Sequence, residues 1–142
     1  MKRIFLILGL LILGVAVGGG AAYATVMLLG PQPAQAEESE TAFVPTGAVL
    51  APLVLRDGRL SGYVSFEVQL EVPADQQEFV TARMPMLLHA INLRTFRSPL
   101  ASGPDGLLPN VDQFRAVVMA AAPEAFGQNV VRHAAITQAN PS

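Results

Sequence analysis

The sequence contains no cysteine and no tryptophan, and charged residues are scarce. Without cysteine the chain can form no disulfide framework, thiolate zinc site or thiol nucleophile, and an oxidising compartment would not harm its fold. Nine Lys and Arg residues against eleven Asp and Glu residues give a net charge of −2. A basic field of the kind that binds nucleic acid is therefore absent, which argues against nucleic acid as a partner.

Length and hydropathy indicate one domain and a membrane segment. The 142 residues suffice for one compact domain. Charged residues make up only 14% of the chain, against roughly 25% in soluble domains, and the mean hydropathy is +0.42. We therefore expect part of the apolar residues to lie in lipid, so the membrane itself is the first expected partner.

Residues 4–29 form the longest apolar run and carry no charge. A helix of this length rises about 39 Å, which exceeds the ~30 Å hydrocarbon core of a bilayer. Lys2 and Arg3 precede the run and acidic residues follow it, so the positive-inside rule places the N-terminus in the cytoplasm. We expect residues 1–30 to be the cytoplasmic tip and a single transmembrane helix, with the rest of the chain outside.

The alternative is a signal peptide cleaved after Ala36. Ala34-Gln35-Ala36 fits the small-x-small cleavage pattern. A signal peptide usually has an apolar region of about 7 to 15 residues, much shorter than this run. We therefore favour a retained anchor, and either reading exports the remainder of the chain.

A stripe of small residues runs along the expected span. Gly14, Gly18 and Ala22 recur every four residues, a spacing that lets two helix backbones approach closely in lipid. The alternative is that glycine is simply common in membrane helices. The stripe predicts helix pairing, and the uncharged span predicts an anchor without an ion pathway.

Residues 31–46 have the composition of an extended tether, with three prolines, three glutamates and small polar residues. Residues 47–142 are then the outer domain. In it, an apolar run over 48–55 and a second over 60–72 flank Asp57-Gly58, which predicts a hairpin. Strict alternation of apolar and polar residues along 64–72 predicts one buried and one solvent face.

The second half of the domain has helical patterns. Asp75 followed by Glu78 resembles a capping box, so we expect a helix from about Gln76, kinked at Pro85. Its expected apolar face comprises Val80, Met84, Leu87, Leu88 and Ile91.

Asn110 is expected to cap a second helix that Pro123 bends or ends and Gly127 stops. Residues 130–138 are expected to form a last strand. The predicted domain is α+β, in the order β-β-α-α-β.

Residues that could carry chemistry are isolated. His89 and His133 have no partner at metal-ligand spacing, so we expect no metal site. No nucleophile elbow is present, and Glu67 and Glu71 share a solvent face with nothing apolar to raise a pKa. We expect no catalytic residue, no cofactor and no small-molecule substrate.

Arginines are the more informative side chains. The outer domain uses arginine without lysine, and Arg83, Arg94 and Arg97 gather around the first expected helix. The planar guanidinium makes several hydrogen bonds at once, which suits protein interfaces. A solvated charged face is the alternative. We treat these three arginines as a possible protein interface.

The whole layout resembles the flagellar basal-body-associated FliL family. The resemblance rests on the basic N-terminus, one span, an acidic tether, Leu53-Val54-Leu55, and the segments GYVSFEVQLEV at 62–72 and RMPMLLHAI at 83–91. It implies a bacterial inner-membrane protein whose periplasmic domain resembles the stomatin/prohibitin (SPFH) fold. It also implies rings associated with flagellar stator proteins and a supporting, non-enzymatic role in motility. The last expected strand is richer in alanine and less aromatic than the family pattern, which leaves a scaffold or accessory subunit of another envelope complex as the alternative.

Energetics also favour a homo-oligomer. The outer domain has fewer than 100 residues and hence a small core, so lateral association would add buried area. Pro52 in an expected edge strand marks one sheet edge. The small-residue stripe offers a second contact within the membrane, and each contact raises the effective concentration for the other.

Overall fold

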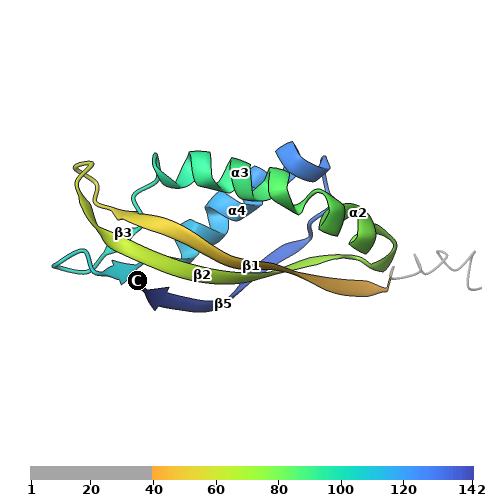
Figure 1. The fold of residues 1–142 in the computed structure, drawn as a ribbon, viewed down its shortest axis with the longest axis horizontal. Helices are drawn as coiled ribbons and strands as arrows, with labels where there is room; N and C mark the ends of the chain where they lie inside the picture. Colours follow the sequence, from red (N-terminus) through yellow and green to blue (C-terminus); the bar gives the residue numbers. More distant parts are fainter. Residues whose placement is uncertain (1–39) are drawn as a thin grey trace, which may run out of the picture. The chain divides into compact units, whose positions relative to one another are not determined.

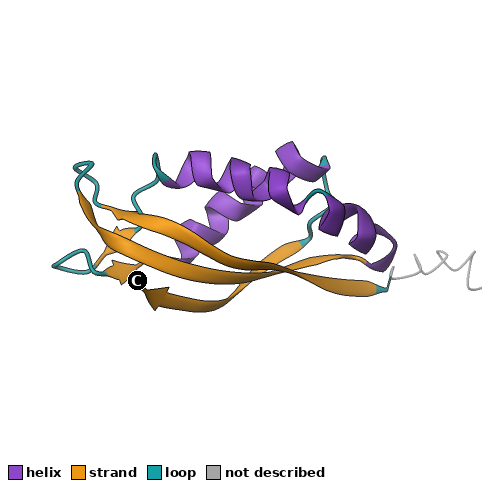
Figure 2. Cartoon of the chain, viewed as in Figure 1, coloured by secondary structure: helices purple, strands orange, loops and turns teal. Residues whose placement is uncertain are grey.

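The computed structural model describes residues 40–142. These residues form an α+β domain in which helices cover one face of an antiparallel sheet (Figure 1; Figure 2). The elements are β1 (Thr41–Val54), β2 (Leu60–Pro73), the 3-10 helix η1 (Ala74–Gln76), α2 (Gln77–Ala82), α3 (Met84–Thr95), β3 (Ala101–Ser102), β4 (Leu108–Pro109), α4 (Val111–Phe126) and β5 (His133–Pro141). The predicted α+β class is confirmed for this part of the chain.

The expected membrane segment lies outside the described residues, and so do Gly14, Gly18 and Ala22. Within residues 40–142, no helix is both long enough and apolar enough to cross a bilayer. The anchor and its pairing stripe therefore stay predictions.

The main sheet has the strand order β1-β2-β5, with both pairings antiparallel. The alternation predicted for the central strand is confirmed, because one side of β2 is fully buried against the helices and the other side meets solvent. The buried set is Val64, Phe66, Val68, Leu70 and Val72. β2 therefore divides the domain into a helix-covered face and an open face.

β1 begins at Thr41, inside the segment 31–46 that composition assigned to a tether. Thr41 pairs with Pro73, so the expected boundary at residue 47 is wrong. The proline-containing, polar composition is compatible with a strand here because β1 is an edge strand, where one side of the backbone needs no ladder partner. Pro45 and Pro52 both lie in β1, which confirms the edge position predicted from Pro52.

The hairpin predicted at Asp57-Gly58 is present. The Leu55 N–H donates to the Arg59 carbonyl at 2.8 Å, and Gly58 has a φ of +84°, which glycine adopts without strain. A second, smaller hairpin of β3 and β4 packs beside it, and the Ser61 hydroxyl donates to the Gly106 carbonyl. This second hairpin was not expected, because strands of two residues carry no periodic signal.

The first helical segment departs from prediction at both its start and its middle. A 3-10 turn precedes α2, and no side chain caps either η1 or α2, so the proposed capping box of Asp75 and Glu78 is wrong. The chain breaks between two helices at Arg83, whereas a kink was expected at Pro85. Pro85 instead lies in the first turn of α3, where its missing N–H is not needed.

α4 closely follows its predicted limits. The Asn110 side chain accepts from the Gln113 N–H at 3.0 Å, and Gly127 follows the helix with a φ of +92°. Pro123 lies inside α4 without ending it. The expected cap and stop of this helix are confirmed.

β5 covers His133–Pro141, whereas residues 130–138 were expected. Val130 and Val131 precede the strand, in the connection from α4 that includes Asn129 in a left-handed conformation (φ +61°). The predicted strand began too early because Val130 and Val131 are apolar. These two residues instead pack against the core from a loop. Without the short β3–β4 hairpin, the predicted element order was also incomplete.

The core lies between β2 and the two longer helices. Its largest fully buried side chains are Phe66, Phe114, Leu70, Leu87, Ile91 and Leu100. Of the face predicted for the first helix, Val80, Leu87 and Ile91 are buried, and Met84 and Leu88 are half-buried against the core. The helix layer is thereby fixed on one side of the sheet.

Candidate functional site

The three arginines of the predicted interface do not form one cluster. Arg83 precedes the first residue of α3, and its guanidinium carbon lies 4.5 Å from the centroid of the Phe79 ring. Arg94 lies in the last turn of the same helix, and Arg97 follows the end of the helix. A 12-residue helix spans about 18 Å, so Arg83 belongs to a separate surface.

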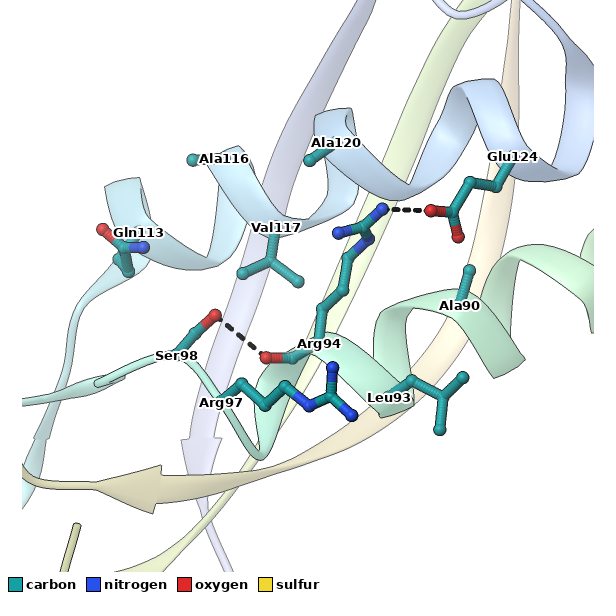
Figure 3. A pocket seen from close by; sticks show the side chains of 10 residues that line it. All are labelled: Ala90, Leu93, Arg94, Arg97, Ser98, Gln113, Ala116, Val117, Ala120 and Glu124. Carbon is teal, nitrogen blue, oxygen red and sulfur yellow. Dashed lines mark hydrogen bonds and ion pairs between the residues drawn. The ribbon is translucent and has the colours of Figure 1, made fainter.

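Arg94 and Arg97 line a hollow of about 480 Å³ between α3 and α4 (Figure 3). We call this hollow the α3–α4 groove. Half of its lining residues are apolar, three of them alanines, and the exposed side chain of Leu93 forms part of one wall. The complete lining is Ala90, Leu93, Arg94, Arg97, Ser98, Gln113, Ala116, Val117, Ala120 and Glu124.

One face of α4 forms one wall of the groove. Ala116, Ala120 and Glu124 recur every four residues, so they occupy one face of α4. Alanine side chains let another backbone approach closely because they project little from the helix. The groove therefore offers an apolar floor with charged groups at its rim.

The electrostatics of the groove are unbalanced. Arg94 forms an ion pair with Glu124 through its Nη2 atom, and the Ser98 hydroxyl donates to the Arg94 carbonyl at 2.9 Å (Figure 3). The Arg94 Nε atom is buried and has no hydrogen-bond partner within residues 40–142. With Arg97, the groove carries two cations against one carboxylate, which favours an anionic occupant.

The second notable surface is the open face of the sheet, opposite the helices (Figure 2). Phe43, Leu50 and Tyr63 are 57%, 58% and 40% exposed. Their partners across β1 and β2 are Glu71, Ser65 and Pro52, respectively. Glu71 and Ser65 are polar, whereas Pro52 is buried. Large exposed apolar side chains on one sheet face are typical of a protein-binding surface.

The histidines have the positions expected of surface residues. His89 is exposed on α3. The His133 Nδ1 atom lies 3.1 Å from the Glu71 carboxylate on the open face. Within the described range, no three His, Cys, Asp or Glu residues are grouped so that they could hold a metal ion.

The hairpin tip holds the one described group with a clear pKa shift. The Arg59 Nε–H donates to the Asp57 carboxylate at 2.7 Å, and the Arg59 backbone N–H donates to it at 3.1 Å. These two hydrogen bonds stabilise the charged carboxylate and lower the pKa of Asp57 below its ordinary value. Both side chains are exposed, and their contact bridges two residues of the hairpin tip.

Arg94 and Arg97 were predicted from the sequence as interface residues, but the groove that they line was not predicted. Ala116 and Ala120, which are exposed on α4 and line the groove, were not identified from the sequence. Phe43 was missed because it lies in the presumed tether. The strong alternation of β2 was the available signal for the open face, since it predicted a second face exposed to solvent.

Comparison of the chain with protein-family models, with curated proteins and with solved structures finds no match.

Proposed function

We propose that the chain is a non-enzymatic, single-pass inner-membrane protein whose periplasmic domain binds and supports the flagellar motor. The resemblance to the FliL family and the uncharged run 4–29 support this proposal. A helix layer on one face of an antiparallel sheet is compatible with the expected SPFH-like domain. In this proposal the N-terminus is cytoplasmic, and copies of the chain associate into an oligomer.

The observation that carries a binding role is the open sheet face. Leu50 and Tyr63 leave large apolar areas in solvent that would be covered in a complex. Burying apolar surface contributes roughly 25 cal/mol per Å², so a face with several such side chains can contribute substantially to association. We assign the contact with the motor to this face.

A second candidate is an accessory subunit of another envelope complex. It is favoured by β5, which contains four alanine or isoleucine residues and no aromatic residue, unlike the pattern expected from the resemblance. The fold and the open face serve either function, so the identity of the partner separates the two.

A swimming assay in the organism that encodes the chain tests the proposed role in motility. Deleting the gene should reduce the spread of cells in soft agar, and the intact gene should restore it. Leu50→Asp should fail to restore swimming because it places a charge on the open face. Met86→Asp is the matched control, since Met86 is equally exposed but lies on α3.

Protein levels of both variants must match the unsubstituted chain. Unchanged swimming after deletion of the gene would contradict the assignment to the flagellar motor. It would favour the accessory subunit of another envelope complex. Equal loss from Leu50→Asp and Met86→Asp would contradict the role of the open face.

A further inference from the structure

We propose that the acidic segment at residues 37–40 of a second copy of this chain docks in the α3–α4 groove. The proposal rests on the self-association that is part of the proposed function, but not on the motor. The Arg94 Nε–H is buried without an acceptor, although the same guanidinium is paired with Glu124 through another atom.

The Arg94 side chain is still partly exposed beside the groove, so its outer N–H groups can pair with an acceptor that an occupant supplies. A carboxylate is the best acceptor, because hydrogen bonds between guanidinium and carboxylate are charge-assisted. Arg97 adds a second cation to the lining of the groove. The groove therefore selects for an occupant with more than one carboxylate.

The alanines of the α3–α4 groove place a second requirement on the occupant, which concerns the size of its side chains. Ala90, Ala116 and Ala120 project little from their helices, so the backbone of an occupant with small side chains can come close to them. A segment rich in bulky residues would be held away from Arg94. The occupant should combine carboxylates with alanine-like neighbours.

Residues 37–40 meet both requirements. Glu37, Glu38 and Glu40 place three carboxylates within four residues, the densest acidic stretch of the sequence. Ala34 and Ala36 come just before them. Most other acidic groups near the sheet and helices are spaced singly, and several already have a cationic partner, among them Asp57, Asp112 and Glu124.

The start of β1 argues for a segment from a second copy. The Glu40 carbonyl accepts from the Ala74 N–H, which fixes this residue at the end of the sheet beside η1. Arg94 lies in the last turn of α3 and Arg97 just after it, about 18 Å from the start of that helix. In Figure 1 the start of β1 lies near α2, at the other end of the helix layer. A second copy in a head-to-tail arrangement can bring its acidic segment to the groove. Each copy then offers one segment and one groove, so the contact can extend beyond a dimer.

The absence of native cysteine makes disulfide trapping a clean test. Two full-length chains of different tagged size are purified in mild detergent, one with Ser39→Cys and one with Ala120→Cys. Ser39 lies among the three glutamates, and Ala120 is an exposed groove residue. Mild oxidation of the mixture should join the two chains. Ala82→Cys is the matched control, because Ala82 is an exposed alanine on α2 outside the groove.

The charge requirement is tested in the same assay. Arg94→Gln with Arg97→Gln in the Ala120→Cys chain should lower the mixed product at least fivefold, and so should 0.5 M salt. A melt of this variant by circular dichroism checks that it is folded. The proposal would be overturned by an equal yield of mixed disulfide with Ala82→Cys. It would also be overturned if the yield with Ala120→Cys did not fall when both arginines were replaced.

Two further outcomes of the disulfide trapping would also overturn the proposed contact. A chain with both Ser39→Cys and Ala120→Cys that closes a disulfide within itself, without forming mixed dimers, would show docking in its own groove and overturn the second-copy assignment. If no disulfide forms, light scattering of the unsubstituted chain separates the causes. An oligomer would then overturn only the groove contact, and a monomer would overturn self-association as well.

Discussion

The rings of Phe66 and Phe114 stack face to face, with centroids 3.8 Å apart and planes 9° from parallel. Phe66 lies in the central strand and Phe114 in the first turns of α4, so this pair joins the sheet to the helix layer. Both side chains are fully buried. The contact therefore determines how α4, and with it the α3–α4 groove, lies over the sheet.

Replacing Phe114 by alanine should destabilise the protein by about 3 to 5 kcal/mol, because it leaves a cavity against Phe66. Phe96→Ala is the control, since Phe96 is largely exposed and should change stability by less than about 0.5 kcal/mol. Urea unfolding followed by circular dichroism measures both. Similar midpoints for the two variants would contradict the packing described.

Asn110→Ala should cost about 0.5 to 2 kcal/mol, because it removes the side-chain acceptor of the Gln113 N–H at the start of α4. Asn92→Ala is the comparison, as Asn92 is exposed within α3. The same unfolding assay applies. A loss no greater than that of the comparison variant would mean that the cap contributes nothing to stability.

These two sites also illustrate how far the sequence predicts this fold. The Asn110 cap and the buried face of β2 were predictable because each depends on local chemistry or a strict period of two. The start of β1 was not, because the segment around Pro45 has the composition of a linker and becomes a strand only by pairing with the end of β2. Tertiary pairing overrides local composition there.

The candidate site was predictable only in part, for a similar reason. Arg94 and Arg97 are three residues apart and share a helix end, so sequence spacing brings them together. Arg83 is near in sequence but lies at the break between α2 and α3, at the other end of α3 from Arg94. The walls contributed by α4 arise from the crossing of two helices joined by a loop and a small hairpin, which no local pattern encodes.

Gly106→Ala should destabilise the contact between the two hairpins. A Cβ atom at residue 106 would lie 2.7 Å from the Leu55 Cδ2 atom, and the φ of +71° is unfavourable for alanine by roughly 1 to 2 kcal/mol. Gly62→Ala is the control, because no atom lies within 4 Å of a Cβ there and its φ is not positive. Amide hydrogen exchange should become faster in β3 and β4 for the first variant alone; unchanged exchange would contradict this close approach.

The pKa of Asp57 should respond to Arg59 and not to Arg56. The hydrogen bonds from Arg59 lower the pKa of Asp57, so their stabilising effect is present above the unfolded pKa and is lost as the pH falls through the folded value. Arg59→Gln should raise this pKa towards its ordinary value in a carboxyl NMR titration. An equal rise with Arg56→Gln would indicate general charge rather than the hydrogen bonds.

Photo-crosslinking at the open face tests the central claim most directly. A photoreactive amino acid replaces Leu50 in the full-length protein in living cells, and Met86 is replaced in a parallel strain as the exposed control on the helix side. Irradiation should join the Leu50 variant, and not the Met86 variant, to a membrane protein of the flagellar motor that mass spectrometry identifies. Adducts that are the same at both positions, or no motor protein at Leu50, would contradict the proposed binding face and function.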